Sequence, residues 1–293
     1  MKPITVLSIK EFETEDLSTS FYANSICNHV VKHEKAISKP HKHDFYLTVI
    51  FTKGFGIHEI DFNVYNVAPG SVFLLRPGQI HNWELSDDID GYIFFHSENF
   101  YELEYINRTM HSFPFFHSIQ NPPILYLNIE QTKQVAAIFN TIYQEFTTDF
   151  LYKKEKLTSL LDLLFIELSR LYLDTDTIEI YKSSTYTNKL CEFEKLIDNH
   201  FKEEKSPAVY ANMLHITPKH LNRIVKTSLN KTSLDVILDR VILEAKRMLV
   251  HSNDSLSNIA NVLGYEDYAY FSRMFKRKTG NSPSVFKKEH INK

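Results

Sequence analysis

Three histidines have the residue type and spacing of a metal or ligand site. His41 and His43 form an H-x-H pair, and His81 follows later in the chain. Three imidazoles suit zinc, iron or copper, and three histidines alone can bind zinc. The alternative is that these side chains line an effector pocket or make structural hydrogen bonds. Two further pocket candidates are Arg76 and Trp83, for which a surface arginine and a core aromatic are the alternatives.

Cationic side chains near the C-terminus have the pattern of a nucleic-acid-binding helix. Three apolar residues recur at helical spacing and predict a buried face: Phe271, Met274 and Phe275. Three cations lie off that face: Arg273, Lys276 and Arg277. Asp267 is placed to cap the start of this helix, and Gly280 to end it in the left-handed conformation. Ser282-Pro283 predicts the start of one more helix.

A shorter helix is predicted just upstream, over residues 255–263, and it ends at Gly264. Two short helices joined by a glycine-containing turn, the second one basic, describe a helix-turn-helix. The second helix of that motif enters the major groove of DNA. The alternative is a solvated charged face on an ordinary helical bundle.

A repeat in the sequence favours the DNA-binding interpretation. Fifty residues before Phe271, Arg273, Phe275 and Lys276 stand Leu221, Arg223, Val225 and Lys226. The preceding helix repeats as Ala211-x-x-Leu214, and Thr217-Pro218 predicts the start of an earlier recognition helix. Thr232-x-x-Asp235 predicts a capping box at the start of a long helix that joins the two units and ends near Val250.

Each predicted recognition helix presents outward side chains near its start, where base edges are within reach. Arginine suits guanine and asparagine suits adenine, each through paired hydrogen bonds. In the first unit these positions are Lys219, His220, Asn222 and Arg223, and in the second they are Tyr268, Ala269, Ser272 and Arg273. Other cations around the units are expected to bind phosphates, namely Lys226, Lys276 and Arg277.

This arrangement resembles the AraC/XylS family of bacterial transcription regulators over residues 188–288. The most specific matches are Ile259-Ala260, Gly264-Tyr265, Tyr270-Phe271-Ser272-Arg273, Phe275-Lys276, Gly280 and Ser282-Pro283. One departure is His215, which stands where the family often has a turn glycine, although histidine tolerates positive φ better than most residues. The resemblance implies double-stranded DNA, a small-molecule effector and RNA polymerase as partners.

Length and charge divide the chain into two parts. The 293 residues suffice for two domains, and 43% hydrophobic content supports packed cores. From Lys182 to the end there are 19 Lys and Arg against 12 Asp and Glu, a balance of +7, whereas the remainder has 14 against 24, a balance of −10. That asymmetry is expected of a DNA-binding domain joined to an acidic partner domain.

The sequence favours a cytoplasmic protein. It has no apolar run near the ~18 residues of a membrane span and no signal-peptide pattern. Its two cysteines, Cys27 and Cys191, fall in different halves and do not indicate a disulfide framework.

Residues 20–97 are predicted to form strands, because short aromatic and β-branched or alternating segments are separated by Gly and Pro turns. Several such strands favour a barrel or jelly roll. With the H-x-H pair and His81, this region is similar to the cupin-like sensory domain of AraC-type regulators. In metal-binding cupins a glutamate shortly after the pair joins the ligand set, but residues 45–48 here are Phe-Tyr-Leu-Thr. We therefore expect no bound metal and no cofactor.

From about Glu98 the pattern predicts helices, with a broad apolar stripe on the second long one. The stripe contains Leu157, Leu161, Leu164 and Leu168, and its width predicts a homodimer through this region. The alternative is that one monomer buries the whole stripe. The expected α+β multidomain organisation is a cupin-like effector domain (1–97), a helical dimerisation segment (98–173), a linker (174–188) and a DNA-binding domain (189–293). Its helix-turn-helix units lie at about 206–230 and 255–280.

Three classes of function follow from these parts. The first is an effector-responsive transcription regulator, and the second is a constitutive dimeric DNA-binding protein. The third is a cupin metalloenzyme with an attached DNA-binding domain. No catalytic constellation is present, because the chain lacks a nucleotide-binding glycine loop, G-x-S-x-G and HExxH. We expect the first class.

Overall fold

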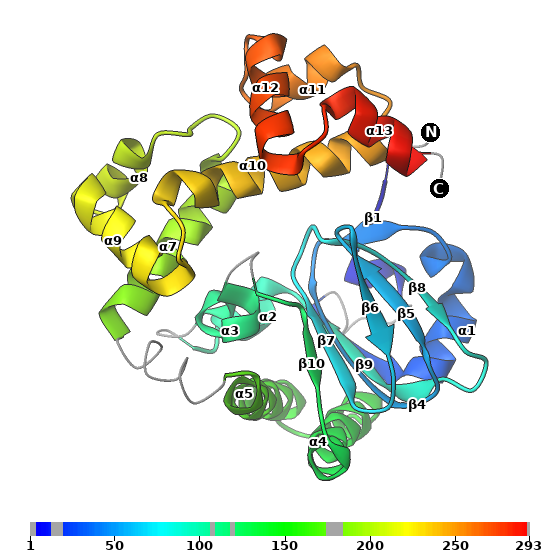
Figure 1. Cartoon of the computed structure of the whole chain (residues 1–293). Coiled ribbons are helices and arrows are strands. Elements are labelled where there is room, and N and C mark those ends of the chain that lie inside the picture. Colours follow the sequence, from blue (N-terminus) through cyan, green and yellow to red (C-terminus); the bar gives the residue numbers. More distant parts are fainter. Residues whose placement is uncertain (1–3, 13–19, 106–108, 118–120, 174–183, 292–293) are drawn as a thin grey trace. The chain divides into compact units, whose positions relative to one another are not determined.

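The computed structural model describes residues 4–12, 20–105, 109–117, 121–173 and 184–291. The chain separates into two compact units, Thr5–Thr175 and Asp176–Lys293 with Met1–Ile4, and each is described by itself (Figure 1). Within the described ranges, no helix combines the length and apolar character needed to cross a membrane. Of the expected linker, residues 174–183 lie outside the described residues.

In the N-terminal unit, the described residues form ten strands in two sheets. They are β1 (Thr5–Leu7), β2 (Phe21–Ser25), β3 (His41–His43), β4 (Tyr46–Lys53), β5 (Gly56–Ile60), β6 (Asn63–Val67), β7 (Ser71–Leu75), β8 (Ile80–Leu85), β9 (Asp90–His96) and β10 (Ile124–Tyr126). One sheet has the order β1–β3–β8–β5–β6 and the other β10–β7–β4–β9–β2. The predicted barrel or jelly roll is thus a pair of open sheets.

The second sheet is apolar on both faces because each face is covered. Side chains alternate along a strand, so Leu47, Val49 and Phe51 of β4 enter the interior that the first sheet also lines. Tyr46 and Ile50 point the other way and join a separate cluster with the helices. This double burial explains why residues 45–51 form an almost continuous apolar run rather than an alternating one.

The helices of this unit are α1 (Ile26–Ile37), α2 (Glu98–Glu102), α3 (Pro114–His117), α4 (Ile129–Thr147) and α5 (Lys153–Tyr172), with 3₁₀ turns η1 (Ile9–Glu11) and η2 (Met110–Ser112). Helix α1 corrects the prediction that residues 20–97 contain only strands. It starts where the Ser25 side chain accepts a hydrogen bond from Asn28 N, which is the local signal for a helix start.

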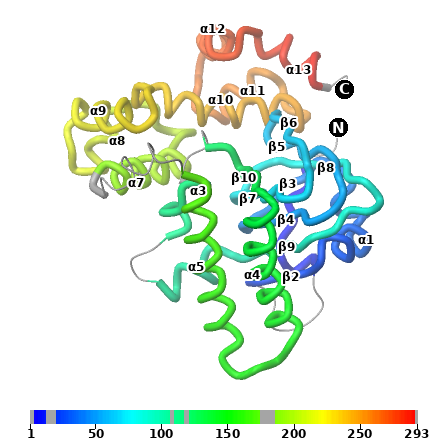
Figure 2. The backbone as a smooth tube through the Cα atoms, turned by 60° about the horizontal axis from the view of Figure 1, so that its bottom comes forward, coloured from blue at the N-terminus to red at the C-terminus, as the bar shows by residue number. Residues whose placement is uncertain are grey.

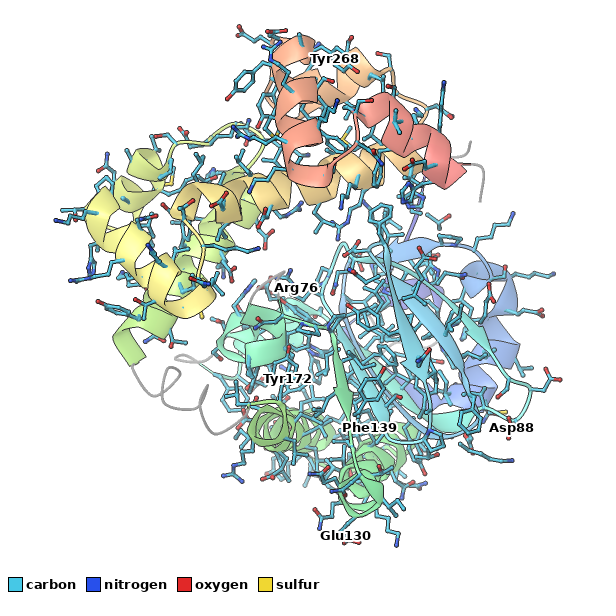
Figure 3. The ribbon with its side chains drawn as sticks, in the orientation of Figure 1. Arg76, Asp88, Glu130, Phe139, Tyr172 and Tyr268 are labelled. Atoms are coloured by element: carbon cyan, nitrogen blue, oxygen red, sulfur yellow. The ribbon has the colours of Figure 1, made fainter. Side chains whose placement is uncertain are left out.

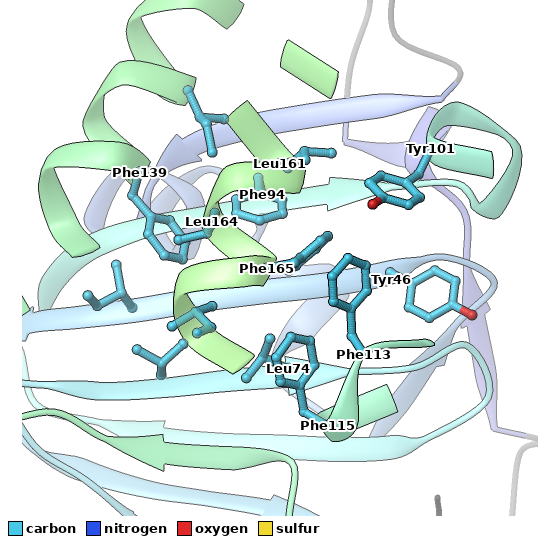
Figure 4. Packing of buried hydrophobic residues seen from close by; sticks show 14 of the residues in the cluster. Tyr46, Leu74, Phe94, Tyr101, Phe113, Phe115, Phe139, Leu161, Leu164 and Phe165 are labelled. Carbon is cyan, nitrogen blue, oxygen red and sulfur yellow. The ribbon is translucent and has the colours of Figure 1, made fainter. Parts of the chain in front are cut away.

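Helices α4 and α5 lie side by side and cover the outer face of the second sheet (Figure 2). Leu157, Leu161, Leu164 and Leu168 are 0–3% exposed. Figure 4 shows Leu161, Leu164 and Phe165 among the aromatic side chains Phe94 and Phe139. The prediction that these four leucines form a dimer interface is therefore wrong, since they belong to the core of a single chain.

The C-terminal unit is helical. Its helices are α7 (Ser184–His200), α8 (Pro207–Met213), α9 (Pro218–Leu229), α10 (Ser233–His251), α11 (Leu256–Val262), α12 (Tyr268–Thr279) and α13 (Pro283–Ile291). Helix α10 connects the pair α8–α9 to the pair α11–α12, as predicted. The capping box of Thr232 and Asp235 at its start is confirmed.

The two helix-helix turns have the same backbone hydrogen bond although their residues differ. Ile216 N donates to Ala211 O in the first turn, and Tyr265 N donates to Ala260 O in the second. The residue before each donor has a positive φ, 55° at His215 and 77° at Gly264. The prediction that His215 keeps the turn is confirmed.

Candidate nucleic-acid interface and histidine cluster

Helices α9 and α12 have the same pattern of exposure at ten successive positions, counted from Leu221 and from Phe271. Four predicted core residues are fully buried: Leu221, Val225, Phe271 and Phe275. The same register places Arg223 with Arg273, and Lys226 with Lys276, at equivalent exposed positions. The two helices therefore present equivalent cations from equivalent places on two copies of one unit.

Exposed cations border an open hollow on the surface of α9. Lys219, Arg223 and Lys226 line it, together with the half-buried His220. The hollow runs along the helix from Thr217, whose side chain accepts a hydrogen bond from His220 N, to Asn230. A cationic hollow along an exposed helix suits the phosphate-rich surface of DNA.

Arg223 is held by two neighbouring side chains. Its Nη2 donates to His220 Nδ1 over 2.7 Å. Its guanidinium carbon lies 6.0 Å from the ring centroid of Tyr186 on α7, and that ring is 5.8 Å from the ring of His220. His220 therefore orients Arg223, and Tyr186 is a supporting residue that the sequence pattern did not identify.

Asn222 is turned towards α10. Its Oδ1 accepts hydrogen bonds from Ser233 N at 3.1 Å and Ser233 Oγ at 3.4 Å. Paired recognition of adenine needs the oxygen as well as the NH₂ group of an asparagine. Asn222 Oδ1 is thus engaged by Ser233, although Asn222 also lines the hollow, and its contact with a base stays a prediction. Ser272 stands at the matching, also half-buried, position of α12.

The first turn of α12 begins at the predicted cap, because Ala269 N donates to Asp267 Oδ1 over 2.7 Å. Tyr268 is half-buried, and its ring lies 6.4 Å from that of Phe271. Tyr270 is 56% exposed and packs beside Tyr265, with ring centroids 6.0 Å apart. The outward positions beyond them are Arg273, Lys276 and Arg277, all exposed.

Lys278 ties α12 to α10 rather than facing outward. Its Nζ lies 2.7 Å from Asp235 Oδ1 and 3.2 Å from Asp239 Oδ1. The hydrogen bond from Lys278, followed by that from Thr232, lowers the pKa of Asp235 to about 2. The tie fixes the recognition helix on the connecting helix.

The predicted histidines converge in the N-terminal unit. His41 and His43 of β3 and His81 of β8 are 1–3% exposed, and one ring nitrogen of each lies within 4.8 Å of the others. His81 Nε2 is 3.1 Å from His43 Nε2. His41 Nδ1 donates to the carbonyl oxygen of Lys39 over 2.8 Å.

A fourth histidine, His58 of β5, belongs to the same group. Its Nε2 is 2.8 Å from His81 Nδ1, and it is fully buried. Burial lowers the pKa of His58 to about 3, and it lowers the pKa of His43 and His81 well below the usual range. The sequence signal was the period of two in β5, since His58 shares a sheet face with the buried Ile60.

The other two pocket candidates lie apart from one another. The half-buried Trp83 has its ring 5.2 Å from that of His58 and 5.4 Å from that of His81. Arg76 directs its guanidinium to the backbone oxygen of Phe116 in α3, at 3.5 Å, and Figure 3 labels it near that helix. Trp83 thus belongs to the histidine cluster, and Arg76 contacts α3.

Two family models match this chain. Residues 25–161 match the AraC-like ligand binding domain, and residues 210–289 match a helix-turn-helix domain. Together they cover the unit with the histidine cluster and the unit with α9 and α12.

Curated relatives match over most of the chain. The transcriptional activator RhaS of Escherichia coli O81 is 25% identical over 246 residues, which are 83% of this chain and 85% of RhaS. The uncharacterized transcriptional regulator YfiF of Bacillus subtilis is 21% identical over 250 residues, covering 84% and 78%. Among solved structures, ToxT of Vibrio cholerae is 14% identical, with 94% and 99% coverage and a TM-score of 0.43.

Proposed function

Because the chain belongs to the AraC/XylS family of transcriptional regulators, we propose that α9 and α12 enter two successive major-groove segments of one operator. The protein is a DNA-binding regulator with an N-terminal effector-binding domain. The observation that carries the proposal is the matched exposure of α9 and α12 on one connecting helix. Successive groove segments on one face of DNA lie one helical turn apart, about 34 Å.

The side chains divide into two proposed roles. Arg223 and Arg273, near the middle of the exposed faces, contact base edges, with His220 orienting the first of them. Ser272 and Tyr268 are proposed to contact DNA at the edge of the surface that α12 presents to the major groove. Four exposed cations, Lys219, Lys226, Lys276 and Arg277, bind phosphates and supply most of the affinity.

We further propose that the effector binds beside the histidine cluster and Trp83, inside the N-terminal unit, and that two chains form a dimer. The dimer surface would lie at the connection between α4 and α5, where Phe150, Leu151 and Tyr152 are 65–81% exposed. Contiguous exposed apolar side chains are typical of interaction surfaces. We also propose that the protein activates transcription, as the activator name of the RhaS relatives suggests, and that it does so through RNA polymerase in the cytoplasm.

The proposal is tested by mapping the operator. Genomic footprinting should give a site in which each chain protects two major-groove segments about one helical turn apart. Arg223→Ala should remove protection of one segment and Arg273→Ala that of the other. Protection of a single segment, or loss of the same segment in both variants, would contradict entry of both helices. DNA affinity that no small molecule changes would favour a constitutive regulator instead.

A further inference from the structure

We propose that His41, His43 and His81 bind one divalent transition-metal ion, with Zn²⁺ as its expected form, and that His58 orients His81. This reverses the expectation of no metal, which was based on a missing glutamate. The proposed site lies between β3, β8 and β5 of the first sheet. It is independent of how the C-terminal unit contacts DNA.

The distances among the ring nitrogens support a shared ligand. Two imidazole nitrogens on one tetrahedral zinc, each about 2.0–2.1 Å from the metal, are about 3.3 Å apart. His43 Nε2 and His81 Nε2 are separated by 3.1 Å. One nitrogen of His41 lies within 4.8 Å of both.

The hydrogen bond of His41 leaves one of its ring nitrogens with a free lone pair that can bind a metal. A carbonyl oxygen only accepts, so His41 Nδ1 carries the proton in its bond to Lys39 O, and the Nε2 of a neutral ring is bare. Metal-binding histidines regularly donate their other N–H to a carbonyl or a neighbouring side chain in this way.

His58 supplies the corresponding partner for His81. If His81 Nδ1–H donates to His58 Nε2, then His81 Nε2 is bare and directed towards His43. His58 Nδ1 has no hydrogen-bond partner among the described residues, so the chain of hydrogen bonds from His81 ends at His58. The same pair of bonds fixes both the tautomer and the ring orientation of His81.

The chemistry of the donors selects the class of metal. Three imidazoles without a carboxylate or thiolate suit zinc, copper, nickel or iron, and they do not suit Mg²⁺ or Ca²⁺. Metal ligation requires the neutral imidazole, with one ring nitrogen unprotonated and free to bind the ion. Three protein ligands leave a fourth position for water.

The first experiment uses the full-length protein, purified without a histidine tag, equilibrated with micromolar Zn²⁺ and then dialysed. We expect elemental analysis to find about one zinc per chain. X-ray absorption of the zinc form should show imidazole nitrogens at about 2.0–2.1 Å. Less than about 0.1 zinc per chain, or a first shell that contains sulfur, would overturn the proposal without any variant being needed.

Variants then locate the ion. His41→Ala with His81→Ala should remove the metal, and His58→Phe should weaken zinc binding by about 10–100-fold because it removes the partner of His81. His96→Gln is the matched control, because His96 is equally buried but packs with Tyr46 on the other face of the second sheet. Retention of zinc by the double variant would place the ion elsewhere. If the protein bound no metal but still bound its operator, the metal proposal would fail and the proposed DNA contacts would stand.

Discussion

At the residue scale, two neighbouring side chains of α9 that helical spacing places on the outer face differ in their hydrogen-bond partners. Arg223 is exposed, and its guanidinium is oriented by His220. Asn222, one residue earlier, uses its side-chain oxygen to accept a hydrogen bond from Ser233 N. Helical spacing gives the direction of a side chain, but it does not reveal a partner eleven residues away on the next helix.

The first prediction concerns Asn222. Asn222→Ala should lower the free energy of unfolding of the C-terminal unit by about 1–3 kcal/mol, because the 3% exposed Ser233 loses the acceptor for its N–H. The same variant should also relax the preference at one operator position if Asn222 keeps its predicted base contact. Ser272→Ala, at the matching position of α12, is the control for stability. A changed base preference in Asn222→Ala with unchanged stability would mean that Asn222 contacts a base and does not support Ser233.

The second prediction separates base contact from phosphate contact. Arg273→Ala should cost about 1–3 kcal/mol on the operator and relax the preference at one position. Lys276→Ala should weaken binding to operator and scrambled duplex alike, and it should flatten the salt dependence by about one unit. Arg223→Ala and Lys226→Ala should divide in the same way, because the two helices share one exposure pattern. Equal specificity ratios and equal salt slopes for Arg273→Ala and Lys276→Ala would contradict this placement.

The exposed residues of the DNA-contacting helices were predictable from the sequence. The buried histidine cluster was less predictable. The cations of α9 and α12 follow from helical period and repeat, which are local properties. Convergence of His41, His43 and His81 was suggested by type, but the position of His58 depends on the pairing of β5 with β8. Strand pairing is a long-range property that a single sequence specifies weakly.

At the element scale, the two helix-turn-helix turns solve one geometric problem with different residues. Each turn has one residue with a positive φ, His215 in the first turn and Gly264 in the second. Gly264 has a second constraint, because a Cβ there would collide with the backbone carbonyl of Lys202. Only glycine satisfies both conditions.

The third prediction compares these turns. Gly264→Ala should destabilise the C-terminal unit by at least about 1 kcal/mol, from the left-handed conformation alone, with the collision at Lys202 added. His215→Gly should change stability by less than about 1 kcal/mol, because relief of strain opposes the greater entropy of the unfolded chain. Urea unfolding of both variants measures this. A loss of no more than about 1 kcal/mol in Gly264→Ala would mean that the backbone conformation, and not the collision with Lys202, accounts for the effect.

Elements with local signals were predicted well, and those that depend on distant contacts were not. The capping box of Thr232 and Asp235 and the end of α12 at Gly280 were visible in the sequence. Helix α1 was missed, because its weak apolar pattern lies among strands. The stripe on α5 was given the wrong partner, since an amphipathic helix shows that a face is buried and not what buries it.

At the scale of the whole molecule, buried histidines make the N-terminal unit sensitive to acid. His96 is fully buried; its Nδ1 donates to Ser97 O, and its Nε2 has no partner among the described residues. Burial lowers the pKa of His96 from 6.5 to about 4. Between these values the unfolded chain takes up a proton that the folded chain does not, so stability falls as the pH drops from 6.5 towards 4.

The fourth prediction tests that linkage. His96→Phe should reduce the loss of stability between pH 7 and pH 4 by on the order of 3 kcal/mol, because one group no longer binds a proton on unfolding. Trp83, the only tryptophan, reports unfolding of this unit by fluorescence. His220→Ala, in the other unit, should leave the pH dependence of the Trp83 signal unchanged. An unaltered pH dependence in His96→Phe would mean that His96 is protonated in the folded protein.

The last prediction concerns assembly and separates core from surface on α4 and α5. Leu161→Glu should unfold the N-terminal unit rather than yield a folded monomer, because it buries an unpaired charge in a fully enclosed position. Leu151→Glu, at an 81% exposed position between the two helices, should leave the fold intact and convert the dimer to a monomer. Ile129→Glu is the matched control, since it is 80% exposed at the opposite end of α4. Sedimentation at micromolar concentration, with circular dichroism as the check on folding, distinguishes the cases. A wild-type monomer, or a dimer that survives Leu151→Glu, would place the assembly surface elsewhere or remove it.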